Sequence, residues 1–322
     1  MSKLHPMKNT LFAALLCLLL FSSCSKSDDS NNGTSDLKGT IYYKWATQGI
    51  LKVSFPSLTG GSFIQDDTKL NSYDISRDGQ LRLTAVNVAT LGNDNVQFTL
   101  SNNANSTIVN QFTYQSPARN RFVKGQLSPD NTMIMVESND QADGIAILKT
   151  DGELLYTING IGGVPFDIRD MKMWLPNNEL LFTHGKNIWR IPPPYNSGSL
   201  IKQMDAAEWG HLTVNHQGNK LAMYIGNHIH TMDIDGNNLK QVTTSDFREA
   251  RPVFSPDGKY LMIGSNYRQS AVMGYSWDMK IIPANGEQFN VDPFAANSPG
   301  VVPVVWRGQD DIVSGSGQVI WK

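Results

Sequence analysis

Short runs of alternating apolar and polar residues recur along the chain, and no long helical pattern separates them. In "QLRLTAV" (80–86) apolar residues take alternate positions, which is the period of a strand with one buried face. "TMIMVE" (132–137) and "KYLMIG" (259–264) are short and largely apolar, as strands covered on both faces would be. No window of ten or more residues keeps a period of 3.6 without Gly, Pro or Asn interruptions. The pattern predicts an all-β protein.

The strand signals are organised in a repeat, which is the mark of an architecture built from similar units. The clearest copies are "ARPVFSPDGKYLMIGSN" (250–266) and "RFVKGQLSPDNTMIMVESN" (121–139). Weaker copies cover 73–87, 171–185, 212–227 and 301–317. The turns at the centre of successive copies lie 40 to 52 residues apart. Such a period is typical of propeller blades or solenoid turns.

Turn chemistry favours the propeller. In "SPDG" (255–258), Pro256 fixes φ for a turn, Asp257 can accept from local N–H groups, and Gly258 tolerates positive φ. Asp-Gly or Asn-Gly pairs, which are strong hairpin signals, follow at 151–152, 235–236 and 285–286. One repeat is therefore expected to be a four-stranded antiparallel blade, and several blades around an axis make a β-propeller.

The repeat resembles that of TolB-like propellers, also known as WD40-like PD repeats. The resemblance covers nearly all of 37–322 and is strongest in the last complete copies. It implies a single β-propeller domain over 37–322, and it says more about the fold than about the function.

The number of blades follows from the turn motifs. Six motifs indicate six innermost strands, so six blades are favoured. Seven are possible if "IYYKWATQGILKVSF" (41–55) and "DIVSGSGQVIWK" (311–322) each supply a hairpin. In both arrangements we expect 41–55 to lie beside 301–322 and to close the ring.

The N-terminus departs from the strand pattern. Lys3 and Lys8 precede an apolar run over 11–21, and two serines lead to Cys24. This layout predicts a secretory signal peptide over 1–23, because the run is shorter than the roughly 20 residues of a membrane-spanning helix. "LFSSC" resembles the lipobox of bacterial lipoproteins, which implies that Cys24 is lipidated. Ordinary cleavage with Cys24 as a bystander is the alternative.

The cysteine count is consistent with lipidation. The only other cysteine, Cys17, lies in the segment to be removed, so no internal disulfide is expected. Residues 24–36 are rich in Ser, Asn, Asp and Gly, which predicts a disordered tether. "SKSDD" (25–29) resembles the acidic signal that sends some lipoproteins to the cell surface. The expected location is the outer membrane, either surface-exposed or facing the periplasm.

Charge and motifs exclude several classes of function. With 27 Lys and Arg against 29 Asp and Glu, the chain has no basic excess that would predict nucleic-acid binding. The nucleophile elbow, the phosphate-binding loop and the H-E-x-x-H zinc motif are absent from the sequence. No cofactor is predicted.

Three histidines are the candidates for chemistry. His228 and His230 alternate on one expected strand and so face the same way, and His211 precedes them in the same repeat. Imidazoles converging at a channel mouth could hold a transition metal, as in some propeller lyases that act on pectate fragments. A metal-assisted lyase or hydrolase is therefore the alternative function. No metal is favoured, because no carboxylate has a fixed spacing to the pair.

Aromatic residues suggest binding instead. The seven tryptophans are spread about one per repeat, and most are expected to pack blades together. The insertions 191–199 and 266–277 interrupt the repeat, and insertions on a rigid scaffold commonly carry recognition. We expect a contact surface at Tyr267, Arg268, Tyr275 and Trp277. The favoured function is a lipid-anchored, non-catalytic propeller that binds a protein partner or a glycan at the cell envelope.

Overall fold

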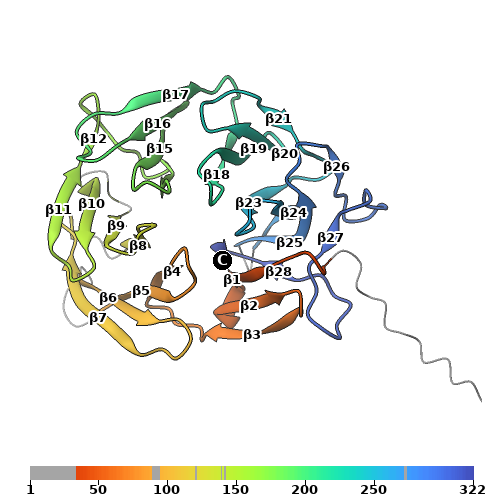
Figure 1. Cartoon of the computed structure of the whole chain (residues 1–322), viewed down its shortest axis with the longest axis horizontal. Helices are drawn as coiled ribbons and strands as arrows, with labels where there is room; N and C mark the ends of the chain where they lie inside the picture. Colours follow the sequence, from red (N-terminus) through yellow and green to blue (C-terminus); the bar gives the residue numbers. More distant parts are fainter. Residues whose placement is uncertain (1–33, 89–94, 120–121, 139, 141–142, 272–273) are drawn as a thin grey trace, which may run out of the picture. The chain divides into compact units, whose positions relative to one another are not determined.

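The strands form a β-propeller around a central axis (Figure 1). The computed structural model describes residues 34–322 apart from 89–94, 120–121, 139, 141–142 and 272–273. The predicted signal peptide and Cys24 lie outside the described residues. Within the described part, no helix is long and apolar enough to cross a bilayer.

Six four-stranded blades can be traced through the described residues, each built outward from the axis. The innermost strands are β4 (Leu70–Ile75), β8 (Lys124–Leu127), β14 (Lys172–Trp174), β18 (Trp209–Val214), β23 (Ala250–Phe254) and β29 (Val319–Trp321). The second strands are β5 (Leu81–Asn87), β9 (Met133–Glu137), β15 (Leu180–His184), β19 (Lys220–Ile225), β24 (Tyr260–Ser270) and β1 (Gly39–Lys44). The third strands are β6 (Asn95–Asn102), β10 (Ile145–Lys149), β16 (Asn187–Ile191), β20 (His228–Asp233), β25 (Gly274–Pro283) and β2 (Ile50–Phe55). The outer strands are β7 (Ile108–Gln115), β11 (Leu154–Ile158), β17 (Ser199–Gln203), β21 (Lys240–Gln241), β27 (Val302–Pro303) and β3 (Thr59–Ile64).

Smaller elements lie between the strands of the blades. A 3₁₀ turn, η1 (Ala46–Gln48), joins β1 to β2. β12 (Gly160–Ile161) and β13 (Val164–Pro165) form a hairpin, β22 (Thr243–Thr244) pairs with β26 (Phe289–Asn290), and β28 (Ser314–Gly315) pairs with β25. The all-β, six-bladed prediction is confirmed.

The repeat motif forms a turn between the first and second strands of five blades. In each turn an N–H donates to the carbonyl three residues earlier, at Gly79–Ser76, Asn131–Ser128, Asn178–Leu175, Gly218–Asn215 and Gly258–Ser255. In the SPDG turn, the Ser255 hydroxyl donates to Asp257 (2.7 Å) and accepts from the Tyr260 N–H (3.0 Å). The serine and aspartate of the motif therefore satisfy the backbone where the chain reverses.

The prediction that 301–317 is a sixth copy of this unit was wrong. Val302 belongs to β27, at the outer edge of the blade, and the true sixth innermost strand is β29. Val302 and Val304 are buried in the core between the last blade and the closing blade. An alternation of apolar and polar residues indicates that one face of a strand is buried. Outer strands and innermost strands both have a buried face, so the pattern could not distinguish the two.

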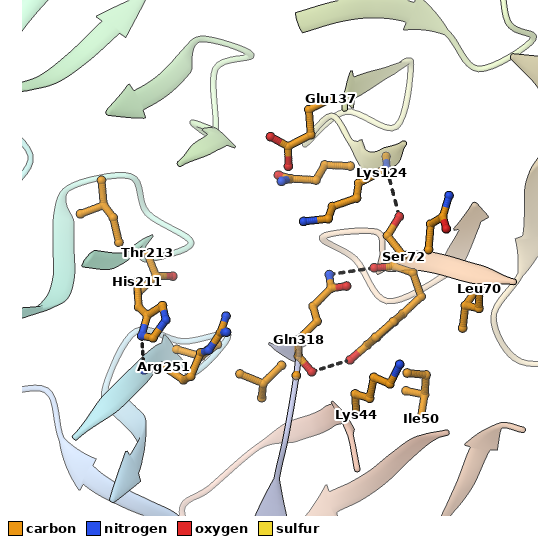
Figure 2. Close-up of a pocket in the computed structure, with 18 of the residues that line it drawn as sticks. Lys44, Ile50, Leu70, Ser72, Lys124, Glu137, His211, Thr213, Arg251 and Gln318 are labelled. Atoms are coloured by element: carbon orange, nitrogen blue, oxygen red, sulfur yellow. Dashed lines mark hydrogen bonds between the residues drawn. The ribbon is translucent and has the colours of Figure 1, made fainter. Parts of the chain in front are cut away.

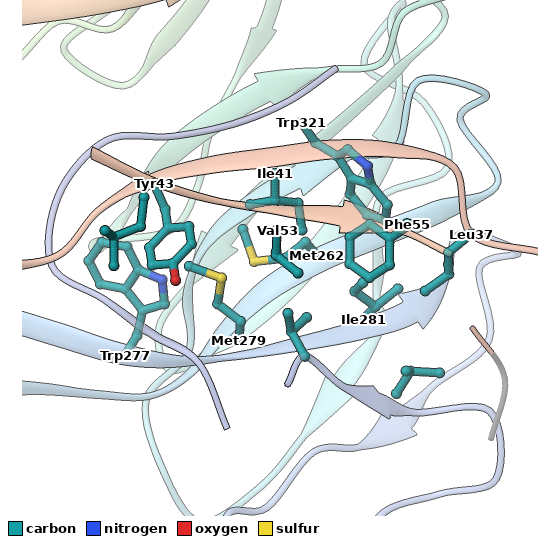
Figure 3. Packing of buried hydrophobic residues seen from close by; sticks show 13 residues of the cluster. Leu37, Ile41, Tyr43, Val53, Phe55, Met262, Trp277, Met279, Ile281 and Trp321 are labelled. Carbon is teal, nitrogen blue, oxygen red and sulfur yellow. The ribbon is translucent and has the colours of Figure 1, made fainter. Parts of the chain in front are cut away.

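The two ends of the propeller share one blade, as predicted for 41–55 and the C-terminal residues. Tyr42 in β1 is the register partner of Ile320 in β29. Trp321 is buried beside Phe55, and its indole N–H donates to the Lys38 carbonyl (2.8 Å). Figure 3 shows how this blade packs on Met279 and its neighbours in β25. The ring is closed by side-chain packing as well as by strand pairing.

The end of the predicted tether is ordered. Thr34 is buried, and its carbonyl accepts from the Leu37 N–H (3.1 Å). The tether predicted over 24–36 therefore extends too far at its C-terminal end. Leu37 is a core residue, and the turn before it packs against the propeller. Residues 24–33 lie outside the described part of the chain.

Candidate functional site: the central channel

The innermost strands enclose a channel. Two cavities of about 450 and 490 Å³ are lined by residues of these strands, and they share residues of β8, β18, β23 and β29. Figure 2 shows Lys124, Arg251 and Gln318 projecting toward the same space from different blades. We therefore treat the two cavities as parts of one channel.

Two neighbouring inner strands carry equivalent β-bulges. The pairing of β18 with β19 shifts register between Gly210 and Thr213, and the pairing of β23 with β24 shifts between Ala250 and Val253. The first residues of these bulges, His211 and Arg251, have φ of +50° and +53°, which is uncommon for residues other than glycine. A bulge turns a side chain away from the direction that a regular strand would give it. Here both bulged residues line the channel.

His211 is held in its neutral form. Burial lowers the pKa of His211 to about 3, and the positive charges of Arg251 and Arg248 lower it further. Its Nδ1 accepts from the Arg251 N–H (3.3 Å), so the ring proton resides on Nε2. Near neutral pH this histidine is therefore a neutral donor and not a cation.

Arg251 brings a positive charge into the channel wall. Its guanidinium lies 5.5 Å from the centre of the Trp277 ring, and its Nε has no hydrogen-bond partner among the described residues. Burial lowers the pKa of Arg251, but an arginine stays charged in proteins. The packing thus leaves hydrogen-bonding capacity unused beside the cavity.

The channel lining is rich in cations. Six Lys and Arg residues line the two cavities against three Asp and Glu residues. Glu137 is paired with Lys172 (3.5 Å) and Asp170 with His184 (2.8 Å). Four of the cations form no ion pair with any described residue, namely Lys44, Lys124, Arg251 and Lys322. The channel is therefore positive although the chain has a formal net charge of −2.

The C-terminal residue occupies one end of the channel. Lys322 lines the second cavity together with Asp74 and His216. Burial lowers the pKa of Lys322, an effect that the charge of Asp74 opposes. Burial also lowers the pKa of His216 to about 4, with contributions from Lys322 and Arg77. Asp74 accepts from the Leu127 N–H (2.8 Å) and so connects two blades.

The predicted contact surface is partly a stack of rings beside the channel wall. Tyr267 stacks between Tyr275 (5.2 Å) and Trp277 (6.1 Å), and Tyr275 is 47% exposed. Arg268 is paired with Asp278 (3.1 Å). Trp277 is fully buried, and its ring fills the space where Gly264 has no side chain. Trp277 thus supports the stack from within the core and offers no surface of its own, which corrects its inclusion in that surface.

The three candidate histidines do not converge. His228 and His230 lie on β20, the third strand of the blade, whereas His211 lies on the innermost strand. The Nδ1 of His228 is 3.3 Å from Glu249 Oε2, and the Nδ1 of His230 is 3.1 Å from the His228 carbonyl oxygen. In the described part of the chain, no group of three His, Cys, Asp or Glu residues is placed to hold a metal ion.

Comparison with known proteins gives the fold. No family model and no curated protein matches the sequence. A TolB structure from Acinetobacter baumannii is similar at a TM-score of 0.57 and 13% identity, over 88% of this chain and 66% of that chain. The Cps50 (Swd1) propeller domain of Myceliophteria thermophila is similar at 0.50 and 14%, over 82% and 87%. A nidogen/laminin complex is similar at 0.53 and 10%, over 76% and 90%.

These likenesses, at such low identity, concern the fold alone. They agree with the repeat, the strand order and the closure described above. In its fold, this chain is a six-bladed β-propeller similar to that of the TolB structures.

Proposed function

We propose that the chain is a non-catalytic binding propeller, anchored by a lipid at the cell envelope, that binds a protein partner or a glycan. The channel is the observation that carries this proposal. A closed ring of blades surrounds a cavity of the size of a small-molecule site. Its lining includes cations without an ion pair, and one of them, Arg251, has an Nε without a hydrogen-bond partner among the described residues. Such a site can hold a ligand by charge and hydrogen bonds without a chemical step.

A binding role is compatible with the fold, since one similar solved structure is described as a nidogen/laminin complex. The metal-assisted lyase or hydrolase has no comparable support, since His228 contacts Glu249 and His230 contacts a backbone carbonyl. We therefore favour recognition over catalysis.

The proposed anchor is Cys24. The layout of charge, apolar run and small residues before it favours lipidation, and the Ser- and Asn-rich residues after it would let the propeller stand away from the membrane. The outer membrane is the proposed location, either surface-exposed or facing the periplasm.

Binding without turnover is the test of this function. The purified full chain is incubated with fractionated envelope glycans and peptides, and both retention and product formation are measured. We expect saturable retention of a component and no turnover above about 1 s⁻¹, a low value for an enzyme. Turnover above that rate, or no retention of any component, would contradict the proposal.

Lipidation is tested separately by mass spectrometry of the N-terminal peptide of membrane-extracted protein. We expect an acylated N-terminal Cys24 in the wild type and release of a Cys24→Ser variant from the membrane fraction. An unmodified cysteine in membrane-extracted protein would contradict the anchor.

A further inference from the structure

We infer that the channel binds a hydroxyl-rich carboxylate of the size of a sugar acid, with Arg251 and Lys124 holding the carboxylate. This inference names the ligand class for the proposed function and rests on it.

The charge of the site requires an anion. Lys124 is exposed on β8 and Arg251 is half-buried on β23, and neither forms an ion pair with a described residue. The Nε of Arg251 is buried without a hydrogen-bond acceptor, and a donor left in this way costs free energy. A carboxylate matches the planar fork of a guanidinium, so the part of Arg251 that lines the cavity suits such a group.

The neutral side chains of the lining offer acceptors for hydroxyl groups. Gln126 donates its amide N–H to the Lys172 carbonyl (3.2 Å), and Gln318 donates to the Tyr73 carbonyl (2.8 Å). Both glutamines are thereby fixed, and their side-chain oxygens accept no hydrogen bond from the described residues. Hydroxyl donors of a ligand fit these two acceptors.

The volume and the backbone agree with a small ligand. A cavity of about 450 Å³ lies in the range of small-molecule sites. Arg251 reaches this cavity through a bulge with φ of +53°, a conformation that costs about 1–3 kcal/mol in general and that clusters at ligand sites. His211, in the equivalent bulge of the preceding blade, fixes the Arg251 backbone by accepting its N–H.

Calorimetric titration of the purified full chain with digalacturonate tests the ligand class. We expect one site with a Kd of about 1 mM or tighter and binding that weakens as NaCl rises from about 50 to 500 mM. The neutral disaccharide cellobiose should not bind measurably. No binding of digalacturonate, or equal binding of cellobiose, would overturn the inference.

Variants test the location. Arg251→Gln should weaken digalacturonate binding about tenfold or more, as expected for the loss of a charge-assisted hydrogen bond. The matched control is Arg248→Gln, which removes the same charge from a residue that packs on Tyr267 but does not line either cavity. Its affinity should equal that of the wild type. Equal weakening by both variants would overturn the site.

Lys124→Gln keeps the test decisive if the Arg251 variant fails to fold, because Lys124 is exposed and unpaired. It should weaken binding several-fold, and unchanged affinity would contradict its role. Hexaglutamate that binds more tightly than digalacturonate would overturn the sugar-acid class. If digalacturonate fails to bind while envelope components are still retained, the inference fails and the proposed function stands; if neither binds, both fail.

Discussion

At the scale of single residues, burial decides which channel side chains carry charge. His211 and His216 both face the channel among several cations, and burial is the largest cause of their lowered pKa values. The nearby charges of Arg251 and Lys322 act in the same direction. Two histidines are therefore neutral in a site whose positive charge comes from Lys and Arg.

These histidines predict a loss of stability in acid. In the unfolded chain both titrate near pH 6.5, whereas in the folded chain their pKa values are about 3 and about 4. Between these limits the unfolded state binds more protons, so the free energy of unfolding falls as the pH drops from about 6.5 toward 4.

Urea unfolding of the wild type and a His211→Gln/His216→Gln variant at several pH values checks this prediction. The free energy of unfolding should fall less in the variant than in the wild type between pH 6.5 and 4. The difference between the two proteins at pH 8, where the histidines are neutral, measures the packing loss and is subtracted at each pH. An equal dependence of the free energy of unfolding on pH in the two proteins would contradict the prediction.

The site residues were only partly predictable. His211 stands out in the sequence as a histidine near two others, but nothing marks Arg251 or Lys124. In a regular strand, alternate residues share a face, and one inserted residue changes which side chains face the axis. The bulges at His211 and Arg251 have no signature in residue type, so the channel lining could not be derived from spacing.

At the scale of elements, the turn motif joins neighbouring blades as well as neighbouring strands. Asp130 accepts from the Ser128 hydroxyl (2.6 Å) and the Thr132 N–H (3.1 Å) within its turn, and from the Asn178 side chain (2.6 Å) in the next blade. Asn131 donates to Asp78 of the preceding blade in the same way (3.2 Å). The motif therefore links turns around the ring.

Asp130→Ala should destabilise the propeller by about 1–3 kcal/mol, because several donors lose their acceptor together. The matched control is Asp151→Ala, in an outer Asp-Gly hairpin where, among the described residues, the carboxylate accepts only from the Glu153 N–H (3.0 Å). This change should cost about 1 kcal/mol or less. Chemical denaturation measures both, and an equal cost would show that the inter-blade bond contributes nothing.

The hairpins were predictable because their turns use residues with definite conformational roles. Gly152, Gly236, Gly258 and Gly286 all have positive φ, as the Asp-Gly and Asn-Gly signals require. The segment 301–317 was misassigned because it has strand-like alternation without the Ser-Asp chemistry of the repeat turns. Residue-specific turns were thus more reliable guides than apolar periodicity.

At the scale of the whole propeller, closure of the ring depends on one short strand. β29 has three residues and places Trp321 in the core beside Phe55 and near Leu37. The largest buried side chain of this strand therefore holds the first and last parts of the propeller together.

Trp321→Ala should destabilise the propeller by about 3–5 kcal/mol, the usual cost of removing a buried tryptophan. Ile320→Val, a change at the neighbouring half-buried position, is the control and should cost about 0.5–1.5 kcal/mol or less. Urea unfolding compares the two. A Trp321→Ala variant as stable as the control would contradict the closure described here.

The central claim is that the channel of the propeller binds a sugar acid and leaves it intact. Ligand-observed NMR of digalacturonate with the full chain tests both halves in one sample, because bound ligand gives broadened signals and any reaction gives new ones. We predict broadening that Arg251→Gln abolishes, with no new signals over a day. New product signals, or unbroadened ligand signals with the wild type, would contradict the claim.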